Sequence, residues 1–183
     1  RFDLMKEQLV ILVDEHDGVR GSMEKMEAHR KGVLHRAFSI FIFDSKGKML
    51  LQQRSPEKYH GANLWTNACC SHPQPGETTE QAAKRRQQQE LGFVAPIKEI
   101  FSFTYHAIVE NGLIEHEFDH VFAGEYEGEI IPDESEVADF AYENMDQIRW
   151  ALENQPLKFT SWFRIAFPMI ELWWKETYGK ITA

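Results

Sequence analysis

Cysteine is scarce in this sequence: its 183 residues include only two, the neighbours Cys69 and Cys70. A disulfide between adjacent residues would strain the peptide and would close no useful loop, which excludes a disulfide-stabilised scaffold. We therefore expect free thiols in a reducing, cytoplasmic setting. The pair also lacks the spacing of about two to four residues found in zinc-binding cysteine pairs. This argues against a zinc-stabilised binding module built from Cys69, Cys70 and His72.

Long apolar runs and an excess of positive charge are also missing. No hydrophobic stretch approaches the roughly 18 residues of a membrane-spanning helix, and residues 1–17 do not resemble a signal peptide. The formal net charge is -9, whereas nucleic-acid binding requires a basic surface. We expect neither a membrane nor a nucleic acid as partner. A small anion held by a local basic cluster remains compatible with this charge, and the oligomeric state is not indicated.

The residues that are present are typical of one globular domain. The chain is 43% hydrophobic and has 13 Phe, five Tyr and five Trp, which is enough to bury a core. There is no internal repeat, linker or low-complexity tract. We therefore expect residues 1–183 to form a single domain.

Local patterns predict helices packed against a mixed sheet. Thr78 and Gln81 form a capping box before a run of good helix formers, and Gly92 is placed to end that helix. Asn111-Gly112 predicts a tight hairpin. The predicted strands are 9–13, two within 34–54 joined by a turn at 44–47, 64–72, 97–109, 113–126 and 137–142. The predicted helices are 78–91, 144–152 and 160–179, the last of them interrupted near Pro168.

The two thiols are expected to lie in different environments. His72 precedes Pro73, which disfavours the helical region for His72 and keeps segment 64–72 extended. Side chains alternate along an extended segment, so Cys70 and His72 share one face while Cys69 points to the other.

Several polar residues could form a metal site. Glu115 and Glu117 are two apart in a predicted strand, so their carboxylates project from one face. His29 and His35 flank the start of the second strand, and His72 ends another. Three imidazoles and two carboxylates suit Mg²⁺, Mn²⁺ or Zn²⁺. Their spacing alone is equally compatible with a structural interpretation. The histidines could be solvated or satisfied in the core, and the two glutamates could lie on the solvent-exposed face of an antiparallel strand.

The helix at 78–91 and the loop before it resemble the Nudix box, G-x5-E-x7-R-E-U-x-E-E-x-G-U. Ser71 replaces the leading glycine, and Arg86 and Gln89 replace metal-binding glutamates. A Nudix hydrolase uses these acids to hold metal ions and activate water, so their loss predicts binding of a diphosphate without hydrolysis. In the alignment from Gly92, which matches the second glycine of the box, three charged positions also match: Glu77, Arg85 and Glu90.

Seven stretches together resemble the type I isopentenyl-diphosphate delta-isomerases, Nudix-fold relatives that move a double bond. The resemblance implies an α+β fold, a Nudix-like mixed sheet flanked by helices. It also implies interconversion of isopentenyl diphosphate and dimethylallyl diphosphate, in isoprenoid precursor biosynthesis. The stretches, which extend from residue 24 to residue 163 within a match over nearly the whole chain, are EKMEAHRKGVLHRAFS, LLQQRS, WTNACCSHP, RRQQQELG, FTYHA, IEHEFDHVF and FTSWF.

The resemblance also implies roles for individual residues. Cys70 and Glu117 would exchange protons with the substrate, with Tyr105 hydrogen-bonded nearby. In the forward direction it favours Glu117 as the proton source and Cys70 as the acceptor. Glu90 would reach a second Mg²⁺ that bridges the diphosphate, and Trp162 would line the hydrocarbon pocket. The implied ligands of a site for Mn²⁺, Mg²⁺ or Zn²⁺ are His29, His35, His72, Glu115 and Glu117. The implied diphosphate ligands are Lys25, Arg54, Lys58 and Arg86, which by themselves could equally be a solvated basic patch.

The main alternative is a Nudix pyrophosphohydrolase that acts on a nucleotide-type diphosphate. It shares the fold and the affinity for diphosphate. Arg86 and Gln89, which stand where hydrolysis needs acids, argue against it. So does Cys70, because hydrolysis requires no thiol.

Overall fold

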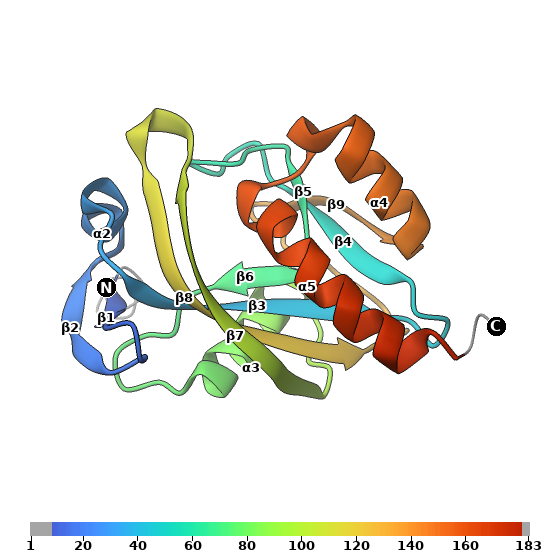
Figure 1. The fold of residues 1–183 in the computed structure, drawn as a ribbon, viewed down its shortest axis with the longest axis horizontal. Coiled ribbons are helices and arrows are strands. Elements are labelled where there is room, and N and C mark those ends of the chain that lie inside the picture. The colour runs from blue at the N-terminus through green and yellow to red at the C-terminus, as the bar shows by residue number, and fades with distance from the viewer. Residues whose placement is uncertain (1–8, 181–183) are drawn as a thin grey trace.

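β3 (His35–Phe43) forms the centre of the sheet, and it is buried at every position except Arg36. Its run of apolar residues is typical of a strand that is covered on both faces. The structure, a computed structural model, describes residues 9–180 (Figure 1).

Nine strands form one mixed sheet within the described residues. β3 pairs in parallel with β8 (Ile114–Glu125), and β8 pairs in antiparallel with β7 (Ile97–Ile108). β6 (Cys69–Ser71) lies antiparallel to β3. The remaining strands are β1 (Leu9–Val13), β2 (Val19–Glu24), β4 (Met49–Arg54), β5 (Trp65–Thr66) and β9 (Val137–Glu143).

The register of these strands brings polar residues together. β3 places His35 opposite Glu117 on β8, and it places Ser39 opposite Cys70 on β6. Alternate residues of a strand share a face, so His35 and Ser39 lie on one face of β3. Through its pairing with β8 and β6, β3 therefore brings His35, Glu117 and the Cys70 thiol to the same region of the sheet.

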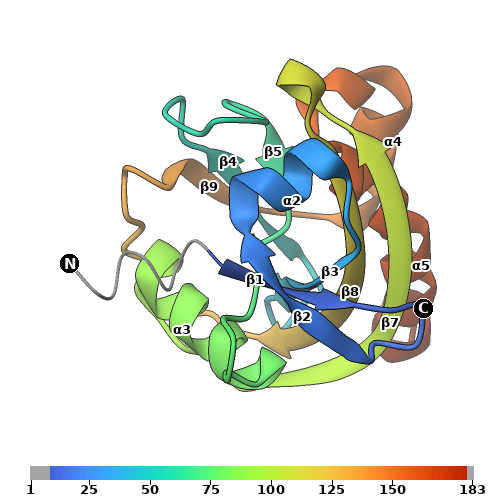
Figure 2. The same cartoon turned by 90° about the vertical axis from the view of Figure 1, so that its left-hand side faces the viewer.

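Helices cover both faces of the sheet, which confirms the predicted α+β class. α3 (Thr79–Leu91) packs in a core cluster with Ile40, whereas α4 (Met145–Asn154) and α5 (Ser161–Tyr178) pack in a second cluster with Phe41. Adjacent residues of β3 thus supply opposite cores. In Figure 2, α3 lies to the left of the sheet, and α4 and α5 lie to the right.

Two local predictions are confirmed in detail. Thr78 Oγ1 accepts a hydrogen bond from the Gln81 amide at 3.1 Å, and the Gln81 side chain accepts one from the Thr78 amide at 2.9 Å. Gly92 ends the helix with a φ of 73°, which favours glycine. Asn111, at the tip of the β7–β8 hairpin, adopts a φ of 61° within a short 3-10 turn at Glu110–Gly112.

The predicted break of the last helix is wrong, because α5 runs through Pro168 without interruption. Pro168 is exposed, so the Arg164 carbonyl that lacks a helical partner can be hydrated. The predicted strand at 64–72 is divided into β5 and β6. The sequence patterns did not predict β2 or the short helix α2 (Lys25–Lys31).

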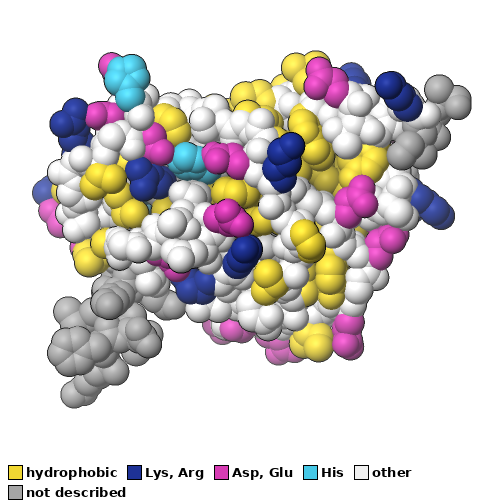
Figure 3. Space-filling model, turned by 90° about the horizontal axis from the view of Figure 1, so that it is seen from below, with side chains coloured by type: hydrophobic (Ala, Val, Ile, Leu, Met, Phe, Trp, Pro, Cys, Tyr) yellow, Lys and Arg dark blue, Asp and Glu magenta, His cyan; other side chains and the backbone are white. Residues whose placement is uncertain are grey.

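The surface is mixed in charge. Basic and acidic side chains are interspersed over the face in Figure 3. Within residues 9–180, no helix combines the length and apolar character needed to cross a membrane.

Candidate active site

A cavity of about 60 Å³ opens where α2, β6, β8 and the start of α5 meet. In a space of this size, groups on opposite walls can reach one small ligand. His29 and His35 are fully buried and do not line the cavity. The other residues named by the family resemblance all line it: Lys25, Arg54, Lys58, Cys70, His72, Arg86, Glu90, Tyr105, Glu115, Glu117 and Trp162.

Three histidines and one glutamate form a candidate metal centre. One ligand atom from each of His29, His35, His72 and Glu117 lies within 4.8 Å of the others. The Nδ1 atoms of His29 and His35 are 2.7 Å and 2.8 Å from the carbonyl oxygens of Lys25 and Val33. Such bonds orient the imidazoles and leave Nε2 available for a metal.

The chemistry of these atoms fits a divalent metal ion. The Nε2 atoms of all three histidines are buried, and within residues 9–180 those of His29 and His35 have no hydrogen-bond partner, while that of His72 lies 3.3 Å from Oε2 of Glu117. Burial lowers the pKa of His29 to about 4 and that of His72 to about 3, so both rings are neutral at neutral pH. Glu117 is also buried, which opposes ionisation, but the nearby imidazoles, with His72 first, lower its pKa overall. Neutral imidazoles and an ionised carboxylate are suitable metal ligands.

Glu115 lies beside these four residues, and its carboxylate is hydrogen-bonded to two other side chains. Its Oε1 is 2.6 Å from Nε2 of His60, and its Oε2 accepts a 3.0 Å hydrogen bond from Tyr105. Burial raises the pKa of Glu115. His60 is itself buried and lines the cavity, and no sequence pattern indicated it, since it lies in a loop 55 residues from its partner.

Cys70 is held by two polar side chains that were not predicted. Its Sγ is 3.1 Å from Oδ1 of Asn67 and 3.4 Å from Oγ of Ser39. Asn67 is fully buried, and its Nδ2 donates to the carbonyls of Ile40 and Cys69. Because those carbonyls can only accept, the amide orientation is fixed and Oδ1 must face the thiol.

The two cysteines differ as the strand alternation predicts. Cys69 is fully buried in the apolar cluster beneath α3, whereas Cys70 lines the cavity. Burial raises the pKa of Cys70, and the nearby Asp119 carboxyl adds to the effect. Asp119, which shares a face of β8 with Glu117, is buried and accepts a 2.7 Å hydrogen bond from Ser39. Burial, followed by the charge of Glu117, raises the pKa of Asp119 well above its usual value.

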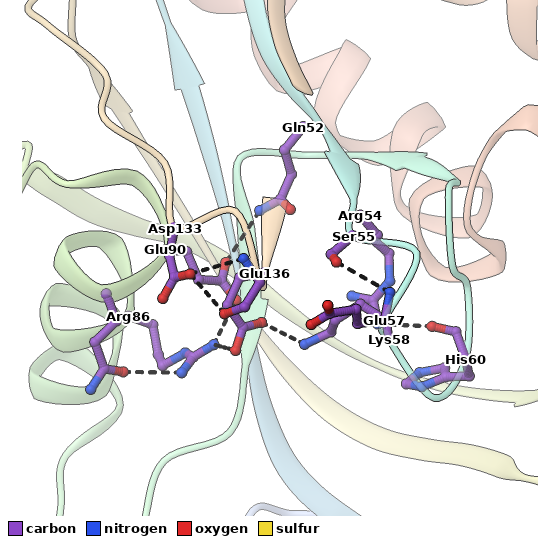
Figure 4. A network of polar contacts seen from close by, with 12 residues as sticks. Gln52, Arg54, Ser55, Glu57, Lys58, His60, Arg86, Glu90, Asp133 and Glu136 are labelled. Carbon is purple, nitrogen blue, oxygen red and sulfur yellow. Dashed lines mark hydrogen bonds and ion pairs between the residues drawn. The ribbon is translucent and has the colours of Figure 1, made fainter. Parts of the chain in front are cut away.

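Four basic side chains line one part of the cavity, which we call the basic mouth: Lys25, Arg54, Lys58 and Arg86. Burial, followed by repulsion from Lys58 and Arg86, lowers the pKa of Lys25 to about 8. The guanidinium of Arg54 lies 5.1 Å from the centre of the Trp162 ring, which joins the basic cluster to the aromatic wall. Figure 4 shows Arg54, Lys58 and Arg86 in one polar network.

The α3 helix carries two of the residues that depart from the Nudix box, and its arginines are paired with nearby glutamates. Arg85 binds Glu77 through two hydrogen bonds of 2.8 Å and 2.9 Å. Arg86, which replaces an acid of the Nudix box, donates to Glu90 at 2.7 Å and to Gln89 at 3.0 Å. This part of the helix therefore presents a cation to the cavity.

Comparison with known proteins first defines the class. The model of the NUDIX domain matches residues 33–163. A Deinococcus radiodurans crystal structure aligns over 80% of this chain and 90% of that chain, with a TM-score of 0.69 and 21% identity. A MutT protein from Methanosarcina mazei aligns over 75% and 93%, with a TM-score of 0.62 and 17% identity. These structures share the fold with this Nudix-domain protein.

Sequence relatives identify the family within that class. An isopentenyl-diphosphate Delta-isomerase 2 from Photorhabdus laumondii is 48% identical over 91% of this chain and 97% of its own length. Isopentenyl-diphosphate Delta-isomerases from Serratia proteamaculans and Burkholderia multivorans are 48% and 43% identical over 86% and 91% of this chain, and 88% and 98% of their own lengths. The chain belongs to the isopentenyl-diphosphate Delta-isomerase family of enzymes.

Proposed function

We propose that this enzyme interconverts isopentenyl diphosphate and dimethylallyl diphosphate through Cys70 and Glu117. The observation that carries the proposal is that both groups line one small cavity, beside an aromatic wall and a basic mouth. The substrate is a small homoallylic or allylic diphosphate. The free thiols support a cytoplasmic location.

Moving the double bond requires two proton transfers. Protonation of the terminal alkene carbon gives a tertiary carbocation, and loss of a proton from the neighbouring chain carbon gives the isomer. One group must donate a proton and another must accept one. In the proposed forward direction Glu117, assisted by Tyr105, donates and Cys70 accepts. Burial raises the pKa of Cys70, whereas the nearby imidazoles lower that of Glu117, so the metal-free protein at rest holds the proton on the thiol. The forward step therefore requires that Cys70 first loses this proton and Glu117 gains one, and the roles exchange in the reverse reaction.

The walls of the cavity would stabilise the carbocation and protect it from water. Trp162 is only 6% exposed, and an indole face can stabilise a cation by about 2 kcal/mol where water is excluded. Exclusion of water also prevents capture of the cation as an alcohol.

The metal centre would position the glutamate. We assign His29, His35, His72 and Glu117 as direct ligands, with Glu115 completing the set from the adjacent position. A bound Mn²⁺, Mg²⁺ or Zn²⁺ supplies positive charge that fixes the Glu117 carboxylate and tunes its acidity. Tyr105, whose pKa is raised well above its usual value by burial, stays protonated, and its one O–H can donate to either carboxylate, each of which has an oxygen 3.0 Å away.

The basic mouth would bind the diphosphate. Arginine offers paired donors to phosphate oxygens, and lysine offers a point charge. Glu90 lies beside Arg86 on α3, where it could reach a Mg²⁺ ion carried by the diphosphate. The assigned diphosphate ligands are Lys25, Arg54, Lys58 and Arg86.

Incubation with isopentenyl diphosphate and magnesium in deuterated water tests the proposal. We expect dimethylallyl diphosphate that carries deuterium, because the donated proton comes from a group that exchanges with solvent. Release of phosphate or diphosphate from a nucleotide-type substrate, with no isomerisation, would instead establish the pyrophosphohydrolase alternative.

A further inference from the structure

Glu136 reaches the basic mouth from a segment that the sequence did not connect with the site. It immediately precedes β9, and its backbone amide donates to the Asp133 carbonyl at 2.9 Å. Its own carbonyl accepts a 3.0 Å hydrogen bond from the Ser55 amide. Two backbone hydrogen bonds therefore hold Glu136 in place.

The Glu136 carboxylate contacts two of the proposed diphosphate ligands. Its Oε2 is 2.5 Å from Nζ of Lys58, and its Oε1 is 3.5 Å from the Arg86 guanidinium (Figure 4). Burial opposes ionisation of Glu136, but Lys58 and then Arg86 lower its pKa overall. The carboxylate is thus a resident counter-ion of Lys58 and Arg86.

These ion pairs are shielded from solvent. The side chains of Lys58 and Arg86 are 18% and 15% exposed, and that of Glu136 is 25% exposed. Arg86 is also paired with Glu90 at 2.7 Å. Charges at partly buried positions are screened less than those at the surface, so any anion that binds here must compete with both carboxylates.

Because of these ion pairs, free diphosphate should bind less favourably than metal-bound diphosphate. If a free diphosphate binds Lys58 and displaces Glu136, the Glu136 carboxylate is left beside the oxygens of the diphosphate. These like charges repel each other. A divalent cation on the diphosphate lowers its negative charge and gives the displaced carboxylate a positive neighbour. The repulsion is then largely removed.

We propose that Glu136 is a specificity-determining residue that excludes metal-free diphosphate and makes substrate binding depend on a divalent cation. The inference rests on the proposed function, because it takes the basic mouth as the diphosphate site. It adds a role for Glu136 that is separate from that of the histidine centre.

Calorimetric titration with inorganic diphosphate, with and without magnesium chloride, tests the role. We expect the wild-type protein to bind at least about tenfold more tightly with magnesium. Glu136→Gln should narrow this ratio to about threefold or less, by strengthening binding without magnesium. Glu134→Gln, which makes the same charge change at an exposed residue of the same turn, should behave like the wild type.

The outcomes distinguish this inference from the function on which it rests. If Glu136→Gln leaves metal-free binding unchanged or weaker while thermal unfolding shows an intact fold, the exclusion role is overturned. The same holds if the variant loses only metal-dependent binding, since Glu136 would then act as a metal ligand. If no variant binds diphosphate even with magnesium, the diphosphate site itself is rejected.

Discussion

Tyr105 and Glu117 lie directly opposite each other on β7 and β8, and the phenol oxygen is 3.0 Å from the glutamate carboxylate. The same phenol is 3.0 Å from Glu115. The antiparallel register therefore places both carboxylates within hydrogen-bond distance of one buried O–H group. This relationship ties the proposed proton donor to the paired strands β7 and β8.

Replacing Tyr105 with phenylalanine should slow catalysis more than it weakens substrate binding. The ring would keep its packing against Phe103, whose centre is 5.6 Å away, and only the hydrogen bond would be lost. We expect kcat to fall by about 10- to 100-fold, the effect of losing a hydrogen bond to a charged group. KM should change by less than about threefold. Steady-state kinetics, with Tyr142→Phe outside the cavity as the control, would measure this, and an unchanged kcat would remove Tyr105 from the mechanism.

The two neighbouring thiols should respond in opposite ways to substitution. Cys70→Ala removes a proton-transfer group and should lower kcat by at least about 1,000-fold with little loss of stability. Cys69→Ala removes a buried atom from the apolar cluster, so it should cost about 1–2 kcal/mol of unfolding free energy and retain most of the activity. Isomerase assays and urea unfolding of both variants would separate these effects. A fully active Cys70→Ala enzyme would contradict the assigned role.

Stability of the metal-free protein should depend on pH through the buried histidines. Burial lowers the pKa of His29 to about 4, whereas an unfolded histidine titrates near about 6.5. Between these values the unfolded chain binds a proton that the folded chain does not, so unfolding free energy falls as pH drops through this window. Urea unfolding after chelation should show this fall, and His29→Gln should reduce its slope. An identical slope in the variant would show that His29 is not buried in the neutral form.

Charge reversal at Arg86 should weaken substrate binding. Arg86→Glu would place a third carboxylate beside Glu90 and Glu136, next to the incoming phosphate oxygens. We expect KM to rise by at least about 100-fold, since a favourable contact is replaced by repulsion. Lys84→Glu makes the same charge change at an exposed position of α3 and should leave KM within about threefold. Equal effects of the two substitutions would assign the loss to the overall charge of the helix.

The sequence was most informative where structure depends on near neighbours. Alternation alone separated Cys69 from Cys70, and the Thr78 capping box marked the start of α3. α2 has only seven residues and begins directly after β2, so its pattern was too short to recognise. Pro168 suggested a break, but an exposed proline leaves its unpaired carbonyl accessible to water.

Contacts between distant segments were beyond the reach of such patterns. His60 meets Glu115 across 55 residues, Ser39 meets Asp119 across 80, and Lys58 meets Glu136 across 78. These pairs depend on strand register and loop geometry, which no local spacing specifies. The family resemblance supplied roles only for residues in the recognised motifs, so the supporting residues emerged from the structure.

The central claim is that Cys70 and Glu117 act from opposite sides of one bound hydrocarbon chain. A crystal structure with a divalent metal and an unreactive analogue of isopentenyl diphosphate tests it most directly. We expect the hydrocarbon between the Cys70 sulfur and the Glu117 carboxylate, with the diphosphate on Lys58 and Arg86. A hydrocarbon chain bound outside this cavity, or one in contact with only one of the two groups, would contradict the account.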